Sequence, residues 1–168
     1  ARLAEAGALV DGAAFAGHSL GEYTALSAYG RVMPVETTIS IVFQRGSTMH
    51  SLVPRDADGA SNYRMGALRP NQAGIKADEV EAYVRSISEA TGEFLQIVNH
   101  NLAGVQYAVA GTIKGLDALA ADARAKAKAR GGKNPFMFVP GIDVPFHSEV
   151  LRPGVPEFRG RLLELVPE

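Results

Sequence analysis

The sequence contains no cysteine among its 168 residues. This absence excludes disulfide bonds, thiolate catalysis and cysteine-ligated zinc, and it fits a reducing compartment. A net charge of −1, from 17 basic and 18 acidic side chains, produces no field that would attract nucleic acid or an anionic membrane. No apolar run reaches the ~20 residues of a membrane-spanning helix, and no signal-peptide pattern opens the chain. We therefore expect a cytoplasmic protein with neither nucleic-acid nor membrane partners.

Several site types are also missing. No cluster of histidine and acidic residues has metal-ligand spacing, and neither a P-loop nor a dinucleotide-binding fingerprint occurs, so we expect no metal and no resident cofactor. Apolar residues at 46% and charged residues at 21% are typical of a globular domain. The chain starts at Ala1, within a helical pattern over 2–9, and we expect it to be a piece of a longer polypeptide.

The first 62 residues read as strand, tight turn and helix. The apolar run Ala13–Ala16 predicts a strand, and Glu22–Tyr29 predicts a helix that Gly30 ends. Pro34 predicts the start of a second helix, which runs until Pro54. The residues over 55–62 predict a loop.

From Tyr63 the pattern changes to β-α-β-β-α-β. The predicted elements are a strand over 63–68, a helix over 80–91 ended by Gly92, strands over 94–99 and 106–110, a helix over 116–130 and a strand over 136–139. This order is that of a ferredoxin-like unit. We expect an α/β fold in which a ferredoxin-like small subdomain over 63–138 is inserted into a large subdomain over 1–62 and 139–168.

The segment Gly17-His18-Ser19-Leu20-Gly21 matches the G-x-S-x-G nucleophile elbow. Such a turn strains the serine backbone, so the flanking positions must be glycine to avoid neighbouring strands. Ser19 is then the nucleophile, and the Leu20 amide lies at a helix N-terminus, where it can stabilise an oxyanion. The strand-turn-helix context favours a partial α/β-hydrolase-like large subdomain. The alternative is a glycine-rich turn with a chance serine.

A nucleophilic serine needs a base, and the sequence offers four histidines. His18 is adjacent to Ser19 and points away from it, so we expect it to pack or to line a pocket. His50 and His100 are expected to be ordinary, partly exposed polar residues. His147 is the remaining candidate, because the prolines and extended residues around Val144-Pro145-Phe146-His147-Ser148 would hold its ring rigidly. The alternative is an ordinary loop histidine.

Arg45 falls between Met49 and Leu52 on a helical wheel, inside the apolar stripe of its helix. A buried guanidinium needs an anion, which is either a protein carboxylate or a ligand carboxylate held bidentately. Asn99 and Asn101 end a strand of the small subdomain, where they face a cleft or cap a turn.

Three ordered motifs together resemble the malonyl/acyl transferases of fatty acid and polyketide synthases. They are Gly17-His18-Ser19-Leu20-Gly21-Glu22-Tyr23, Phe43-Gln44-Arg45-Gly46 and Val144-Pro145-Phe146-His147-Ser148. The phrase Ile97-Val98-Asn99-His100-Asn101 is similar to the malonyl/palmitoyl transferase domain of type I fatty acid synthases. The resemblance runs from about Gly7 to Val155, and the family also shows an inserted ferredoxin-like lobe.

The resemblance implies a role for each matching residue. Ser19 would carry the acyl group, His147 would act as its base and then as the acid for the leaving thiol, and the Leu20 amide would form half of the oxyanion hole. Arg45 would bind the free carboxylate of malonate, and Phe146 would favour malonyl over branched units. The substrates would be malonyl-CoA and long-chain acyl-CoA such as palmitoyl-CoA. The partners would be an acyl carrier protein, bearing phosphopantetheine, and the remainder of a type I fatty acid synthase.

Two parts of the family pattern are missing from this sequence. A glycine-glutamine motif that completes the oxyanion hole does not precede Ser19, and a glutamine that orients the histidine is absent from the end of the chain. We therefore expect the isolated chain to be inactive, because one oxyanion donor is worth ~100- to 1,000-fold in turnover.

Two further functions remain open. A serine esterase or thioesterase shares the elbow but needs an acid between serine and histidine. Asp117 and Asp122 lie on a predicted helix of the small subdomain and Asp143 lies only four residues before His147, so none of the three is obviously placed for this role. An inactive structural segment of a megasynthase is the other possibility.

Overall fold

The structure, a computed structural model, describes residues 5–8, 10, 12–28 and 32–166. The chain divides into two compact units, Ala1–Thr48 with Gly154–Glu168, and Met49–Pro153. Each unit is described by itself. Within the described ranges, no helix is long and apolar enough to cross a bilayer. Of the helix expected over 2–9, residues 2–4 and 9 lie outside the described residues.

The first unit consists of helices and loops in its described residues. It contains α2 (Leu20–Ala28), most of α3 (Val35–Ser51), whose last residues belong to the second unit, and α6 (Val155–Leu165). Pro34 directly precedes α3, as predicted, and the α3 face with Thr38, Ile41 and Thr48 is buried. Arg161 on α6 donates a hydrogen bond from Nη1 to Gln44 Oε1 on α3 at 2.8 Å.

Two predictions for the first unit are wrong. The segment Ala13–Ala16 is not a strand, because a strand must pair its backbone groups and none of the described residues of this unit forms a partner strand. The apolar residues of α3, among them Ile39, Phe43 and Met49, recur at helical spacing and predict one buried face, but Ile39 and Phe43 are 63% and 69% exposed. The predicted helix after the serine starts earlier, at Leu20, and its expected end at Tyr29 and Gly30 falls outside the described residues.

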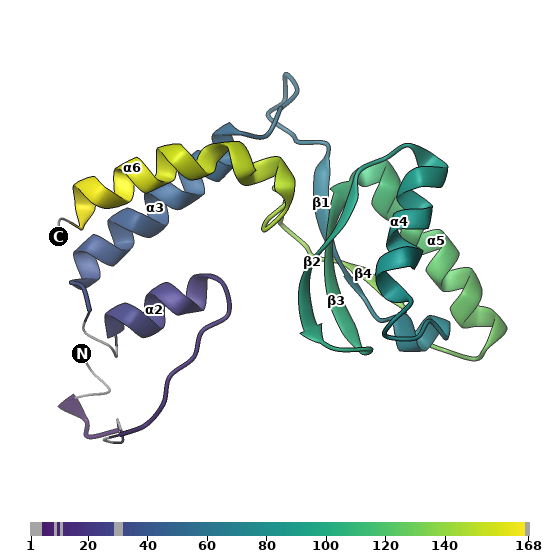
Figure 1. The fold of residues 1–168 in the computed structure, drawn as a ribbon, viewed down its shortest axis with the longest axis horizontal. Helices are drawn as coiled ribbons and strands as arrows, with labels where there is room; N and C mark the ends of the chain where they lie inside the picture. Colours follow the sequence, from purple (N-terminus) through teal and green to yellow (C-terminus); the bar gives the residue numbers. More distant parts are fainter. Residues whose placement is uncertain (1–4, 9, 11, 29–31, 167–168) are drawn as a thin grey trace. The chain divides into compact units, whose positions relative to one another are not determined.

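The second unit is a four-stranded antiparallel sheet covered on one face by two helices (Figure 1). In chain order its elements are β1 (Tyr63–Leu68), η1 (Pro70–Ala73), α4 (Val80–Thr91), β2 (Leu95–Leu102), β3 (Gln106–Thr112), α5 (Ile113–Ala129), β4 (Phe136–Phe138) and η2 (Glu149–Gly154), the last of which ends in the first unit. The strand order is β2-β3-β1-β4. The predicted order of strands and helices over this region is confirmed.

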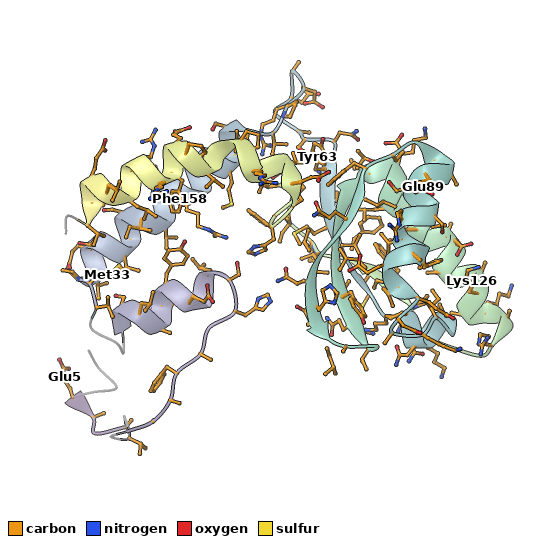
Figure 2. The ribbon with its side chains drawn as sticks, viewed as in Figure 1. Glu5, Met33, Tyr63, Glu89, Lys126 and Phe158 are labelled. Atoms are coloured by element: carbon orange, nitrogen blue, oxygen red, sulfur yellow. The ribbon has the colours of Figure 1, made fainter. Side chains whose placement is uncertain are left out.

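Apolar periodicity explains why these elements form. Val80 and Val84 of α4 and Leu116 and Leu119 of α5 are buried against Val109 of β3. Solvent covers the outer surface of the helices, where Glu89 and Lys126 mark α4 and α5 (Figure 2). Gly92, with φ of 67°, ends α4 in the left-handed conformation that glycine adopts without strain.

The edge strand β2 contains two register shifts, between Ile97 and Asn99 and between His100 and Leu102. Such bulges insert an extra residue and re-aim the side chains that follow. Ile97 pairs with Val109 and therefore lies on the helix-covered face, whereas Asn99 pairs with Ala108 and lies on the opposite face.

Candidate functional site

The turn before α2 has the backbone geometry of a strained elbow. Ser19 has φ of 52°, in the left-handed region that non-glycine residues rarely adopt. Backbone hydrogen bonds from Gly21 N to His18 O (2.9 Å) and from Glu22 N to Ser19 O (3.1 Å) close the turn. Strain of this kind is concentrated at functional sites.

The two glycines of the elbow differ in what they do. A Cβ added at Gly17 would lie 1.9 Å from Gly21 C and 2.0 Å from Gly21 O, so this position accepts only glycine. A Cβ at Gly21 would meet nothing within 4 Å. The expectation that both glycines avoid neighbouring strands is therefore wrong in this chain: the clash at Gly17 is with the turn itself.

Leu20 is the first residue of α2, so its N–H belongs to the four amides that a helix leaves without an intrahelical acceptor. Its side chain is 50% exposed. Ser19 is half-buried and His18 is exposed. The arrangement places a hydroxyl beside a helix N-terminus, which is suited to stabilising a negative charge that develops next to the serine.

Arg45 lies on the buried side of α3, since Ile41 and Thr48 precede and follow it by one turn on that face. Its side chain is half-buried, and its Cζ lies 5.8 Å from the ring centroid of Tyr23 on α2. This is a cation–π contact between the arginine helix and the helix that follows Ser19. No carboxylate of the described residues forms an ion pair with Arg45.

Sequence reasoning missed Tyr23. A signal was present, because Tyr23 closes the motif Gly17-His18-Ser19-Leu20-Gly21-Glu22-Tyr23.

The second group of predicted residues lies in the second unit. His147 is exposed and has φ of 63°, while Pro145 and Ser148 on either side of it are buried. Phe146 is half-buried and donates a backbone hydrogen bond to Val144 O at 2.9 Å. Ser148 donates a hydrogen bond from Oγ to Pro145 O at 2.7 Å. In this turn His147 is therefore exposed, while the residues that anchor the turn are buried.

Asn99 lies on the same side of the sheet as the turn over 144–148, which carries His147 and is called the histidine turn below. It lies on the helix-free face, and Gln96, which pairs with Ala110 on that face, accepts a hydrogen bond from Glu149 N at 2.9 Å. Asn101 is exposed and lies in the second bulge of β2.

His100 lies on the helix side, where Glu81 is 3.2 Å from its Nε2 and Tyr107 is 5.0 Å away between ring centroids. This placement separates His100 from the histidine turn. His50 is exposed on α3, in agreement with its prediction as a partly exposed polar residue.

Two of the acidic residues considered for a hydrolase are already engaged. Asp143 pairs with Arg55 at 2.5 Å, and Asp122 accepts a hydrogen bond from the Tyr83 hydroxyl at 2.7 Å. The hydrogen bond from Arg55 holds the pKa of Asp143 below its usual value, and desolvation together with Asp122 raises the pKa of Tyr83. Both carboxylates have structural partners within the second unit.

The predicted residues therefore form two groups. His18, Ser19, Leu20 and Arg45 belong to the first unit, and Asn99, Asn101, Phe146 and His147 belong to the second. The pairing of Ser19 with His147 stays a prediction.

Comparison with known proteins identifies relatives across nearly the whole chain. The fatty acid synthase beta subunit TOXC of Cochliobolus carbonum is 38% identical over 93% of this chain and 9% of its own length. The fatty acid synthase subunit beta of Saccharomyces cerevisiae is 34% identical over 89% of this chain and 9% of its own length.

A solved acyl carrier protein S-malonyltransferase from Vibrio cholerae has 29% identity and a TM-score of 0.70, over 97% of this chain and 47% of that structure. The chain thus spans about a tenth of these curated relatives and less than half of the solved neighbour. The family described as "Acyl transferase domain" matches residues 1–130. The fold is an α/β fold with a small sheet, similar to these acyltransferases, and the chain belongs to the acyl transferase domain family.

Proposed function

We propose that this chain forms the acyl-enzyme site of an acyltransferase that moves malonyl, and in a type I synthase also palmitoyl, between CoA and acyl carrier protein. The observation that carries the proposal is the elbow at Ser19. Ser19 has a positive φ, and any side chain at position 17 would clash with the backbone of Gly21. Membership of the acyl transferase family supports the reaction class.

The proposed reaction has two half-reactions. His147 accepts the Ser19 hydroxyl proton while Oγ attacks the thioester carbonyl, and the Leu20 amide stabilises the resulting oxyanion. The carbon–sulfur bond then breaks, and the leaving CoA thiolate takes the proton from His147. In the second half-reaction the phosphopantetheine thiol of the carrier protein gives its proton to His147 and attacks the acyl-serine carbonyl. The ester bond between the acyl carbon and Ser19 Oγ then breaks, and Oγ takes the proton from His147.

The substrate-binding residues follow from the same proposal. Arg45 would bind the malonyl carboxylate. Its guanidinium is half-buried and contacts the Tyr23 ring, and a carboxylate would supply the opposite charge. Phe146 would select malonyl, and His18, Asn99 and Asn101 would line the substrate site. No resident cofactor or metal takes part, because the thioester supplies the activated acyl group.

The proposal includes a subdomain arrangement and a cellular setting. The β-α-β-β-α-β region over 63–138 would be a ferredoxin-like small subdomain, inserted into an α/β-hydrolase-like large subdomain over 1–62 and 139–168. The protein would work in the cytoplasm as part of a type I fatty acid synthase. The esterase alternative is less well supported, because Asp143 and Asp122 are engaged elsewhere.

The proposal is tested by intact mass spectrometry of the full protein after incubation with malonyl-CoA, and again after holo-carrier protein is added. We expect a malonyl adduct on the wild type, its loss on adding holo-carrier protein, and no adduct on Ser19→Ala. Ser27→Ala, which removes the hydroxyl of the serine on α2, is the matched control and should retain the adduct. An adduct on Ser19→Ala would place the nucleophile elsewhere, and release of free malonate without transfer would favour the hydrolase.

A further inference from the structure

The turn that carries His147 is held from both ends. Its ends are Asp143 and Glu149, which are six positions apart in the sequence. Each of them forms a hydrogen bond with a different segment of the second unit. His147 itself adopts φ of 63°, a conformation that persists only where the surrounding structure imposes it.

Two contacts, called ties below, hold the turn: the ion pair of Arg55 with Asp143 and the hydrogen bond of Glu149 with Gln96. The first tie is the ion pair. Arg55 Nη1 donates to Asp143 Oδ2 at 2.5 Å and to Gly59 O at 2.8 Å. The Arg55 side chain is 17% exposed, whereas that of Asp143 is 41% exposed. Arg55 is therefore committed to this contact and is not a solvated surface arginine.

The loop that supplies Arg55 is itself well ordered by hydrogen bonds. Asp56 Oδ1 accepts from the amides of Asp58 at 3.0 Å and Ala60 at 2.8 Å, and Arg55 and Ser61 form a bridge across the loop. These hydrogen bonds hold the backbone from which the Arg55 side chain projects. The side chain can therefore fix the position of the carboxylate that it holds.

The second tie comes from the sheet. Gln96 of β2 pairs with Ala110, which is fully buried, and its Oε1 accepts a hydrogen bond from Glu149 N at 2.9 Å. This contact secures the chain two residues after His147, as the ion pair secures it four residues before.

We infer that Arg55, Asp143 and Gln96 are positioning residues that hold the His147 turn in its catalytic geometry. The inference rests on the proposed role of His147 as the base. Their effect is on the ring's position, since none of the three touches the reacting atoms in this account. A displacement of about 1 Å in a catalytic group costs up to about 100-fold in rate, so loosening either tie should reduce transfer.

The test compares single substitutions in the full protein. Asp143→Asn weakens the first contact by removing the carboxylate charge, and Gln96→Ala removes the acceptor of the second. Arg55→Lys keeps the positive charge but loses the planar fork. Glu93→Gln is the matched control, because it removes another carboxylate of this unit, one that bonds Thr112 at 2.8 Å and Lys114 at 3.1 Å. The measurements are kcat and KM for malonyl transfer, and hydrogen exchange of the amides over 146–149.

We expect Asp143→Asn and Gln96→Ala each to lower kcat about tenfold with KM nearly unchanged. Hydrogen exchange of the amides over 146–149 should be faster in both variants than in the wild type. The kcat and the exchange rate of Arg55→Lys should lie between those of the two variants and those of the wild type. Glu93→Gln should change neither kcat nor the exchange rate. The inference is overturned if exchange at 146–149 is unchanged in both variants, or if their kcat equals that of Glu93→Gln.

His147→Gln separates this inference from the proposed function. Loss of transfer in His147→Gln together with wild-type kcat in Asp143→Asn and Gln96→Ala refutes the positioning role alone. Wild-type transfer in His147→Gln refutes the role of His147 as the base, and with it the catalytic meaning of the ties.

Discussion

At the scale of single residues, Gly17 is the position that the structure constrains most sharply. Its Cα approaches the backbone of Gly21 so closely that a methyl group would need to occupy the same space as a carbonyl. Backbone cannot move aside as a flexible side chain can, so a substitution must distort the elbow.

We predict that Gly17→Ala reduces acylation of Ser19 by roughly 100-fold, because the serine would be displaced by about 1 Å. Gly160→Ala, in open space on α6, is the control and should acylate as the wild type does. The rates are measured by quenched-flow mass spectrometry. Equal acylation in both variants would show that the turn tolerates a side chain there.

Arg45 tests substrate selection. Arg45→Gln should lose malonyl transfer by about 100-fold or more, since a charge-assisted bidentate contact is removed, and should keep palmitoyl transfer, whose acyl chain has no carboxylate. Arg159→Gln, on exposed α6, provides the control for loss of one positive charge. A parallel loss of both acyl groups would remove Arg45 from the carboxylate role.

At the scale of elements, prediction from sequence succeeded where apolar residues recur regularly. The strand Tyr63–Leu68 was predicted with its observed bounds, and the helix ended by Gly92 was predicted with its cap, because each buries one regular face in a core. The strand predicted over Ala13–Ala16 failed because strand pairing depends on a neighbour, which local sequence does not encode.

The candidate site shows the same division. The elbow and Arg45 were predicted from local patterns, whereas the ties on His147 were not. Arg55 and Asp143 are 88 residues apart, and the contact of Gln96 with Glu149 depends on the position of β2 in the sheet. The bulges of β2 contain no glycine that would reveal them in the sequence.

The packing of α5 supplies a prediction at this scale. Leu119→Ala removes a side chain that is 0% exposed in the core of the second unit, and should cost about 2–5 kcal/mol in the free energy of unfolding. Leu163→Ala, at a position 59% exposed on α6, should change it by less than about 0.5 kcal/mol. Urea unfolding followed by circular dichroism measures both, and equal effects would contradict the assignment of the core.

At the scale of the whole molecule, the two units differ in how much apolar surface they bury. Among the described residues, Ile41 is the one buried hydrophobic residue of the first unit, while the main core belongs to the second. Most of the exposed large hydrophobic residues, including Phe43 and Val155, belong to the first unit. Stability should therefore be unequal along the chain.

Native-state hydrogen exchange of the 168-residue chain tests this difference. Amides of β1, β3 and α5 should be the slowest to exchange, and those of α2, α3 before residue 48 and α6 should exchange faster by about 100-fold or more, because few buried contacts oppose their local opening. Uniform protection across both units would contradict this account.

We propose that Ser19 and His147 act as one catalytic pair. Malonyl transfer by the full protein should be compared among Ser19→Ala, His147→Gln and the double variant. Because residues that act as a unit are strongly non-additive, we predict that the double variant is no slower than Ser19→Ala alone. If the two losses instead multiply in the double variant, Ser19 and His147 act independently and the claim is wrong.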